Sequence, residues 1–339
     1  MLCLVKTYKI NIMNADQLCD FRADITRASE RIEKYVYRTP LSYSRYLSKK
    51  TCSNVYFKLE CEQLTGSFKV RGAFNKLLMA GDPKAHFVTA STGNHGMAFS
   101  QALTTLEKTG TVFVPENVAS GKEASLRLFG TAIKKHGFDC VDTEKKAREY
   151  ARDRNAVYVS PYADLEIIYG QGTIGKEIAD ALPDVDAAFV TVGGGGLVSG
   201  IGTYLKSCKR EIEIVGCLPA NSAVMMESVK AGRIVTMESL DTLSDASAGG
   251  VEEGSPTFEL CSKLVDKWVT VSENDIASAI YMMLEHHHKV IEGSAGVAIA
   301  GFLQCAEKYK GKNVAVVLCG SNISMEKLKL IVDCNGKWS

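Results

Sequence analysis

Short apolar runs alternate with longer amphipathic segments along most of this chain of 339 residues. The short runs are rich in Val, Ile and Phe, which predicts strands, and the longer segments repeat their apolar positions with a helical period. We expect strands at 54–60, 86–90, 111–114, 157–160, 187–192, 213–218, 268–271 and 314–319, and helices at 68–80, 97–108, 121–129, 145–154, 173–182, 197–207, 275–288 and 295–309. This alternation is typical of an α/β protein with mostly parallel sheets.

Composition narrows the class of protein. The apolar fraction is 46% and the charged fraction 23%, which is ordinary for a globular protein, and the length suggests about two domains. The 40 basic and 39 acidic residues leave a net charge of +1, so neither nucleic acid nor an anionic membrane is an expected partner. No apolar stretch is long enough for a membrane-spanning helix. Eleven cysteines without a CxxC pair favour free thiols in a reducing cytoplasm over a zinc or disulfide framework.

Ligands of parallel sheets bind where loops leave the carboxyl ends of the strands. Lys69 follows such a loop, and Ser67 is expected to cap the helix that carries it. The positive end of the helix and burial would together lower the pKa of this amine, and a neutral amine can form an imine with a carbonyl. The alternative is a lysine in solvent.

A second loop reads STGNHG and runs from Ser91 to Gly96. Its glycines allow backbone N–H groups to turn inward at a helix N-terminus, which suits a carboxylate. Asn94 adds an amide that donates and accepts hydrogen bonds. His95 is either structural or an acid–base group.

Four consecutive glycines, Gly193 to Gly196, follow the strand at 187–192. They let the backbone approach a phosphate, although close helix–strand packing could explain one or two of them. The pattern is neither GxGxxG nor a P-loop, and no acidic residue ends the next strand, so a monophosphate fits better than a dinucleotide. Cys319 ends the last strand, where its thiol could face a heterocyclic nitrogen or simply belong to the core.

Taken together, SFKVRGA, STGNHG, GQGTIGKEI, GGGGLVSG and VLCGSNIS resemble the signature segments of fold-type II pyridoxal-phosphate enzymes, within them the serine/threonine dehydratase and serine racemase group. The resemblance implies a two-domain, tryptophan synthase β-like α/β fold, with mostly parallel, open, twisted sheets flanked by helices. Its larger, cofactor-binding domain would comprise residues 1–85 and 161–339, and its smaller, substrate-loop domain residues 86–160.

The resemblance also implies residue roles. Lys69 would hold pyridoxal 5'-phosphate as a Schiff base and move the Cα proton, and Thr92 would stand on the opposite face. The other cofactor-binding residues would be Phe68, Asn94, Gly193, Gly194, Gly195, Gly196 and Cys319, with Glu292 near the cofactor. The substrate carboxylate would be held by the loop that comprises Ser91, Thr92, Gly93, Asn94 and His95.

Two departures from the group's pattern matter. Its racemases have a serine where this chain has Thr92, so the hydroxyl is kept but a methyl is added. Its cation site has acids where this chain has Leu218 and Val224, and a divalent ion needs carboxylate oxygens, so no metal site is expected.

The expected function is deamination of L-threonine and/or L-serine, which yields 2-oxobutanoate or pyruvate and ammonia. Two alternatives stay open: a serine racemase with side dehydratase activity, and a non-catalytic α/β ligand-binding protein. A cytoplasmic homodimer is expected.

Overall fold

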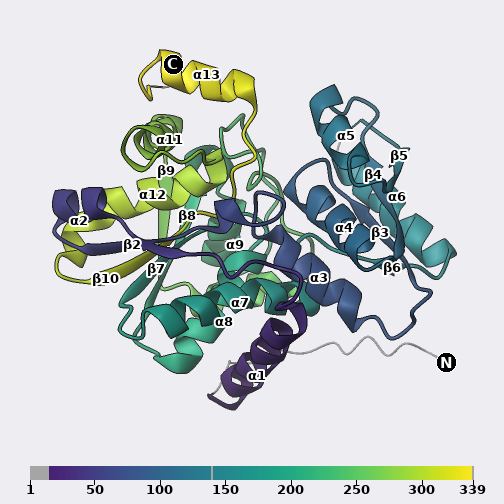
Figure 1. Ribbon diagram of the computed structural model, residues 1–339, viewed down its shortest axis with the longest axis horizontal. Coiled ribbons are helices and arrows are strands. Elements are labelled where there is room, and N and C mark those ends of the chain that lie inside the picture. Colours follow the sequence, from purple (N-terminus) through teal and green to yellow (C-terminus); the bar gives the residue numbers. More distant parts are fainter. Residues whose placement is uncertain (1–14, 139, 338–339) are drawn as a thin grey trace.

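A computed structural model describes residues 15–138 and 140–337 (Figure 1). Its larger sheet has six strands in the order β1-β2-β10-β7-β8-β9. β1 pairs antiparallel with β2, and the other neighbours are parallel. The strands are β1 (Leu41–Tyr43), β2 (Asn54–Lys58), β7 (Ala187–Thr191), β8 (Glu213–Pro219), β9 (Lys267–Val271) and β10 (Asn313–Val317). The α/β architecture with mostly parallel sheets is therefore confirmed.

A second sheet has four parallel strands in the order β5-β4-β3-β6. They are β3 (His86–Ala90), β4 (Thr109–Val114), β5 (Ala132–Lys135) and β6 (Val157–Tyr158). We propose residues 86–160 as the smaller domain and residues 1–85 with 161–339 as the larger one. Residues 1–14, 139 and 338–339 lie outside the described part.

Helices cover both sheets (Figure 1). Those that accompany the four-stranded sheet are α4 (Asn94–Thr105), α5 (Ser120–Arg127) and α6 (Cys140–Asp153). The others are α1 (Ala15–Ile32), α2 (Arg45–Thr51), α3 (Lys69–Met79), α7 (Leu165–Ala181), α8 (Gly196–Cys208), α9 (Val224–Ala231), α10 (Pro256–Leu264), α11 (Glu273–His287), α12 (Gly293–Cys305) and α13 (Met325–Asp333). Between residues 15 and 337, apart from 139, none of them is long and apolar enough to cross a bilayer.

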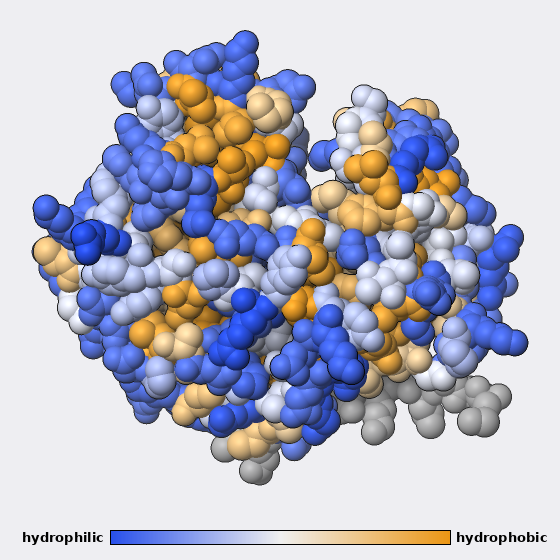
Figure 2. All heavy atoms as spheres, viewed as in Figure 1, coloured by the Kyte–Doolittle hydropathy of each residue, from blue (hydrophilic) through white to orange (hydrophobic). Residues whose placement is uncertain are grey.

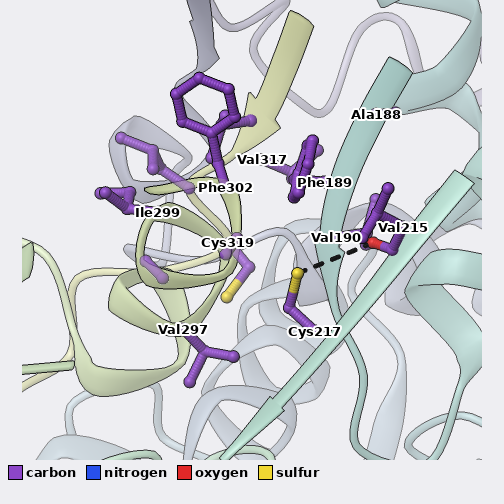
Figure 3. Close-up of a cluster of buried hydrophobic side chains, with 14 of the residues drawn as sticks. Ala188, Phe189, Val190, Val215, Cys217, Val297, Ile299, Phe302, Val317 and Cys319 are labelled. Atoms are coloured by element: carbon purple, nitrogen blue, oxygen red, sulfur yellow. Dashed lines mark hydrogen bonds between the residues drawn. The ribbon is translucent and has the colours of Figure 1, made fainter. Parts of the chain in front are cut away.

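One part of the core of the larger sheet lies between β7, β8 and α12 (Figure 3). All five residues of β7 are buried, as a continuous apolar run in a parallel sheet predicts. The Phe189 ring on β7 meets the Phe302 ring of α12 edge to face, with centroids 5.4 Å apart. Such packing gives the strand ends a rigid base. Figure 2 shows a largely polar face that is hollowed between the part with α13 and the part with α5.

Glycines allow α3 to lie directly against α7. A Cβ atom on Gly170 would lie 2.6 Å from the Cα atom of Gly72, closer than side chains approach backbone. The two helices therefore meet backbone to backbone. This contact sets the position of α3, whose first residue is Lys69.

Candidate active site

A cavity of about 200 Å³ opens where the strands of the larger sheet end. Its wall combines Asn94, from the helix α4 that accompanies the smaller sheet, with residues that mostly come from the larger sheet's side. The cavity is lined by Phe68, Lys69, Asn94, Pro161, Tyr162, Gln171, Thr191, Gly193, Gly194, Gly195, Gly196, Leu197, Ala246, Ser247, Ala248, Gly249, Gly250, Glu292, Ser294 and Cys319.

Lys69 presents its amine inside this cavity. Burial lowers its pKa to about 8, although the nearby Cys319 and Glu292 act in the opposite direction. The Nζ atom donates a hydrogen bond to the carbonyl oxygen of Pro161 at 2.7 Å. The helix begins at Lys69 with Phe68 as its N-cap and no capping side chain, so the expected cap by Ser67 is wrong. Ser67 instead lies in an extended bridge to Gly320, with its hydroxyl buried and unpartnered.

The four glycines form a bare backbone turn between β7 and α8. Gly195 has a φ of 88°, in the left-handed region that favours glycine. A Cβ atom on Gly194 would lie 2.4 Å from the Tyr162 ring, and one on Gly193 would lie 2.7 Å from the carbonyl oxygen of Ser247. Because α8 begins at Gly196, the turn offers backbone N–H groups and a positive helix end to an anion.

Glu292 and Asn94 line the cavity together with Lys69, and Asn322 binds both of them from outside the lining. The Asn94 side chain donates through Nδ2 to both oxygens of Glu292, at 3.0 Å each. Asn322 donates its backbone N–H to Glu292 Oε2 at 3.1 Å and its side-chain Nδ2 to Asn94 Oδ1 at 2.6 Å. Burial raises the pKa of Glu292 to about 7, partly offset by the hydrogen bonds from Asn94. The Glu292 carboxyl can therefore hold or release a proton near neutral pH.

Cys319 contributes a neutral thiol to the same wall. The residue is buried, and burial raises the pKa of the thiol well above its usual value. An uncharged donor at this position differs from a carboxylate, because it cannot stabilise a positive charge on a facing heterocycle.

Part of the expected carboxylate loop lies outside the cavity lining. Of the predicted loop residues only Asn94 lines it; Ser91, Thr92 and Gly93, which precede Asn94 in the chain, are half-buried. The His95 ring is turned inward, with Nε2 3.0 Å from Thr89 Oγ1 and 3.3 Å from the Val159 carbonyl oxygen. Burial lowers the pKa of His95 to about 3, so the imidazole is neutral at pH 7.

Sequence reasoning missed Tyr162, Gln171 and the segment from Ala246 to Gly250, which also line the cavity. The Tyr162 ring lies over the glycine turn, and its hydroxyl oxygen accepts the backbone N–H of Glu252 at 2.9 Å. Gln171 lies within a signature segment, so that segment could have pointed to it. The small residues of SAGG are a weak local signal of a close-packed turn.

Leu218 and Val224 are both buried among apolar side chains. Among the described residues, no three His, Cys, Asp or Glu side chains gather closely enough to hold a metal ion.

The model of the family described as "Pyridoxal-phosphate dependent enzyme" matches residues 32–320. The chain belongs to this family. It is 37% identical to L-threonine ammonia-lyase of Thermotoga maritima, over 91% of this chain and 77% of the relative. It is 32% identical to the catabolic L-threonine dehydratase of Escherichia coli K12, over 91% of this chain and 94% of the relative.

Solved structures of this family share the fold. Processed threonine deaminase isoform 2 of Solanum lycopersicum has a TM-score of 0.88 at 30% identity, covering 94% of each chain. Serine racemase of Dictyostelium discoideum has a TM-score of 0.84 at 30% identity, covering 90% of this chain and 99% of that one. The predicted family, the fold-type II architecture and the dependence on pyridoxal phosphate are thus confirmed, and a non-catalytic ligand-binding protein is not supported.

Proposed function

We propose that this enzyme deaminates L-threonine and/or L-serine, releasing 2-oxobutanoate or pyruvate and ammonia. The observation that carries this proposal is the buried Lys69 amine in one cavity with the bare glycine turn. The relatives named threonine ammonia-lyase and threonine dehydratase support the choice of reaction.

The residues of the cavity fit pyridoxal phosphate. The glycine turn has a backbone free of side chains for a phosphate group, and the neutral Cys319 thiol suits a pyridine nitrogen. We assign the phosphate to Gly193–Gly196, the 3-hydroxyl to Asn94 and one ring face to Phe68. Bound pyridoxal phosphate supplies an electron sink for the carbanion at Cα.

Lys69 acts as the base that takes the substrate's Cα proton. With a pKa of about 8, a substantial fraction of the amine is neutral at pH 7 to 8, which suits proton transfer. The loop from Ser91 to His95 orients the substrate through its carboxylate, with backbone N–H groups at the start of α4 as donors. Because the Cys319 thiol stays neutral, negative charge at Cα is delocalised less, and prompt loss of the β-hydroxyl is favoured.

The assignment of Lys69 predicts where the cofactor attaches. Borohydride reduction of the loaded enzyme should fix a pyridoxyl group on Lys69, and peptide mass spectrometry locates it. Lys58 is the internal control, since its side chain is also buried but its amine binds Glu177 and the Thr39 carbonyl oxygen instead of facing the cavity. Only a neutral amine adds to a carbonyl, so attachment should become faster with pH and level off above about 8. Recovery of the label on another lysine contradicts the assignment.

A racemase is the second candidate, supported by the serine racemase among the similar structures and by the Thr92 hydroxyl. Racemisation needs a proton donor on the face of Cα opposite the lysine. The branched Cβ of Thr92 restricts its χ1 rotamers, so its methyl can take the place of the donor. We therefore place elimination ahead of racemisation.

The change Thr92→Ser tests this choice. With L-serine we expect the wild type to form mainly pyruvate, and the variant to raise the share of D-serine severalfold because serine has more rotamers. Pyruvate and D-serine are measured for both proteins under one set of conditions. Thr105→Ser is the matched control, since Thr105 is an exposed residue at the end of α4, the helix that follows the loop with Thr92. Mainly D-serine from the wild type contradicts the dehydratase, and an unchanged ratio in the variant contradicts the role of Thr92.

We further propose that the enzyme is a cytoplasmic homodimer with a hydroxy amino acid as its small-molecule partner. Eleven cysteines without a paired spacing suit a reducing compartment. All nine cysteines that the structure describes with their side chains are free thiols.

A further inference from the structure

A lysine and a cysteine meet at the end of α12 that lies away from the cavity. α12 starts at Gly293, next to Glu292 in the cavity wall, and ends at Cys305. Lys267, the first residue of β9, points its Nζ atom at Cys305 Sγ with a separation of 3.1 Å. Within the described ranges, the sulfur is the only hydrogen-bonding or ion-pairing partner of this Nζ atom. The Tyr309 ring centroid lies 5.8 Å from it.

Rigid elements hold this pair together. Lys267 is paired with Val215 in the parallel β8–β9 ladder, which fixes the strand. One turn before Cys305, Gly301 brings α12 onto the same sheet so closely that a Cβ atom would lie 2.5 Å from Cys217 Sγ. The amine and the sulfur are thus kept in contact by backbone that does not depend on their mutual hydrogen bond.

Exposure separates Cys305 from the neighbouring thiol. Cys305 and Lys267 are both half-buried, so a small oxidant reaches them from solvent. Cys217 is fully buried in the apolar cluster between β8 and α12 (Figure 3). Of these two thiols, Cys305 is therefore the one that is oxidised first, with the Lys267 nitrogen next to its sulfur.

We propose that Lys267 and Cys305 form a reversible covalent bond when the protein meets a hydroperoxide such as hydrogen peroxide. The sulfur first takes one oxygen: the thiol and hydrogen peroxide give a sulfenic acid and water, and the O–O bond is the bond that breaks. The lysine ammonium loses one proton to solvent, and the neutral nitrogen then attacks the sulfur. An S–N bond forms, the S–O bond breaks, and the hydroxyl leaves as water with a second proton from the nitrogen. The sulfur is oxidised by two electrons and the peroxide is reduced.

The test uses the purified full-length protein and needs neither substrate nor cofactor, so its result is independent of the proposed function. The protein is treated with hydrogen peroxide, remaining thiols are alkylated, and a digest is analysed by mass spectrometry. We expect the peptides of Lys267 and Cys305 to be joined, about 2 Da lighter than their sum because two hydrogens are lost. Trypsin should fail to cut after Lys267, and dithiothreitol should restore both peptides.

Three variants make the result specific. Lys267→Arg keeps the positive charge but should abolish the joined peptide, as should Cys305→Ser. Cys334→Ser removes an exposed thiol on another part of the chain and should leave the joined peptide unchanged. Two outcomes overturn the proposal: sulfinic or sulfonic acid at Cys305 with a free Lys267, or a disulfide between Cys305 and Cys217. Matching thermal unfolding of the wild type and Lys267→Arg shows that the variant is folded.

Discussion

The change Lys69→Ala is expected to lower kcat by about 10³-fold or more, because it removes both the cofactor's attachment point and the base for the Cα proton. Lys69→Arg should lose as much, since a guanidinium stays protonated at any working pH. Steady-state assays of 2-oxo acid formation measure both variants. An added primary amine, such as methylamine, should restore part of the activity of Lys69→Ala, which a purely structural defect would not allow.

The matched control for this prediction lies on the same helix. Lys76 is also on α3 but pairs with Asp164 at 2.7 Å, away from the cavity lining. Lys76→Ala should therefore keep kcat close to that of the wild type. If Lys69→Ala retains activity within about tenfold of the wild type, another group is the base and the proposed mechanism is wrong.

The second large effect is expected for Arg71→Met, which should lower the free energy of unfolding by about 3–5 kcal/mol. The Arg71 guanidinium is buried and donates to Glu60 at 2.8 Å and to Glu177 at 2.7 Å. Without it the fully buried Glu60 carboxylate keeps only the Lys58 amine, 3.9 Å away, as a counter-charge, and a buried charge that has lost its main partner is strongly destabilising. Urea unfolding measures the loss. Arg38→Met is the control, because its ion pair with Asp180 lies in solvent and should contribute under about 1 kcal/mol.

The pH dependence of this variant follows from Glu60. Burial alone would raise the pKa of Glu60, but Arg71, Lys58 and Thr39 together outweigh burial, and the pKa is lowered in the folded protein. In the wild type this group therefore stabilises the fold above its unfolded pKa, and the contribution is lost as the pH falls through the folded value. In Arg71→Met burial dominates and the carboxyl protonates more easily. The stability gap between the two proteins should thus be smaller at about pH 5 than at pH 7; a gap that widens on acidification contradicts this account.

Local pattern was enough for the strands with strong apolar runs. The strand predicted at 86–90 matches β3, and the run predicted at 187–192 exceeds β7 by one residue. Exposed or weakly patterned elements were missed. β5 carries mostly exposed side chains, so it has no apolar run that would predict a strand. α7 begins at Leu165, eight residues before the predicted start at residue 173. Two glycines in its first half have a low helix propensity, so the sequence did not indicate a helix there. In the structure the close contacts of these glycines with α3 and α8 compensate for that low propensity.

The features of the active site likewise fall into those that the local sequence predicts and those that only the fold determines. The sequence by itself determined the glycine turn and the lysine at the start of a helix, because both depend on residues adjacent in the chain. Only the tertiary structure decided that Asn94, Glu292 and Asn322 share hydrogen bonds, since 198 residues separate the first two. It also decided that His95 turns away from the cavity and that Ser67 does not cap α3. These contacts depend on burial and on segments that are far apart in the chain but close in the fold. The spacing of residues within one segment predicts neither.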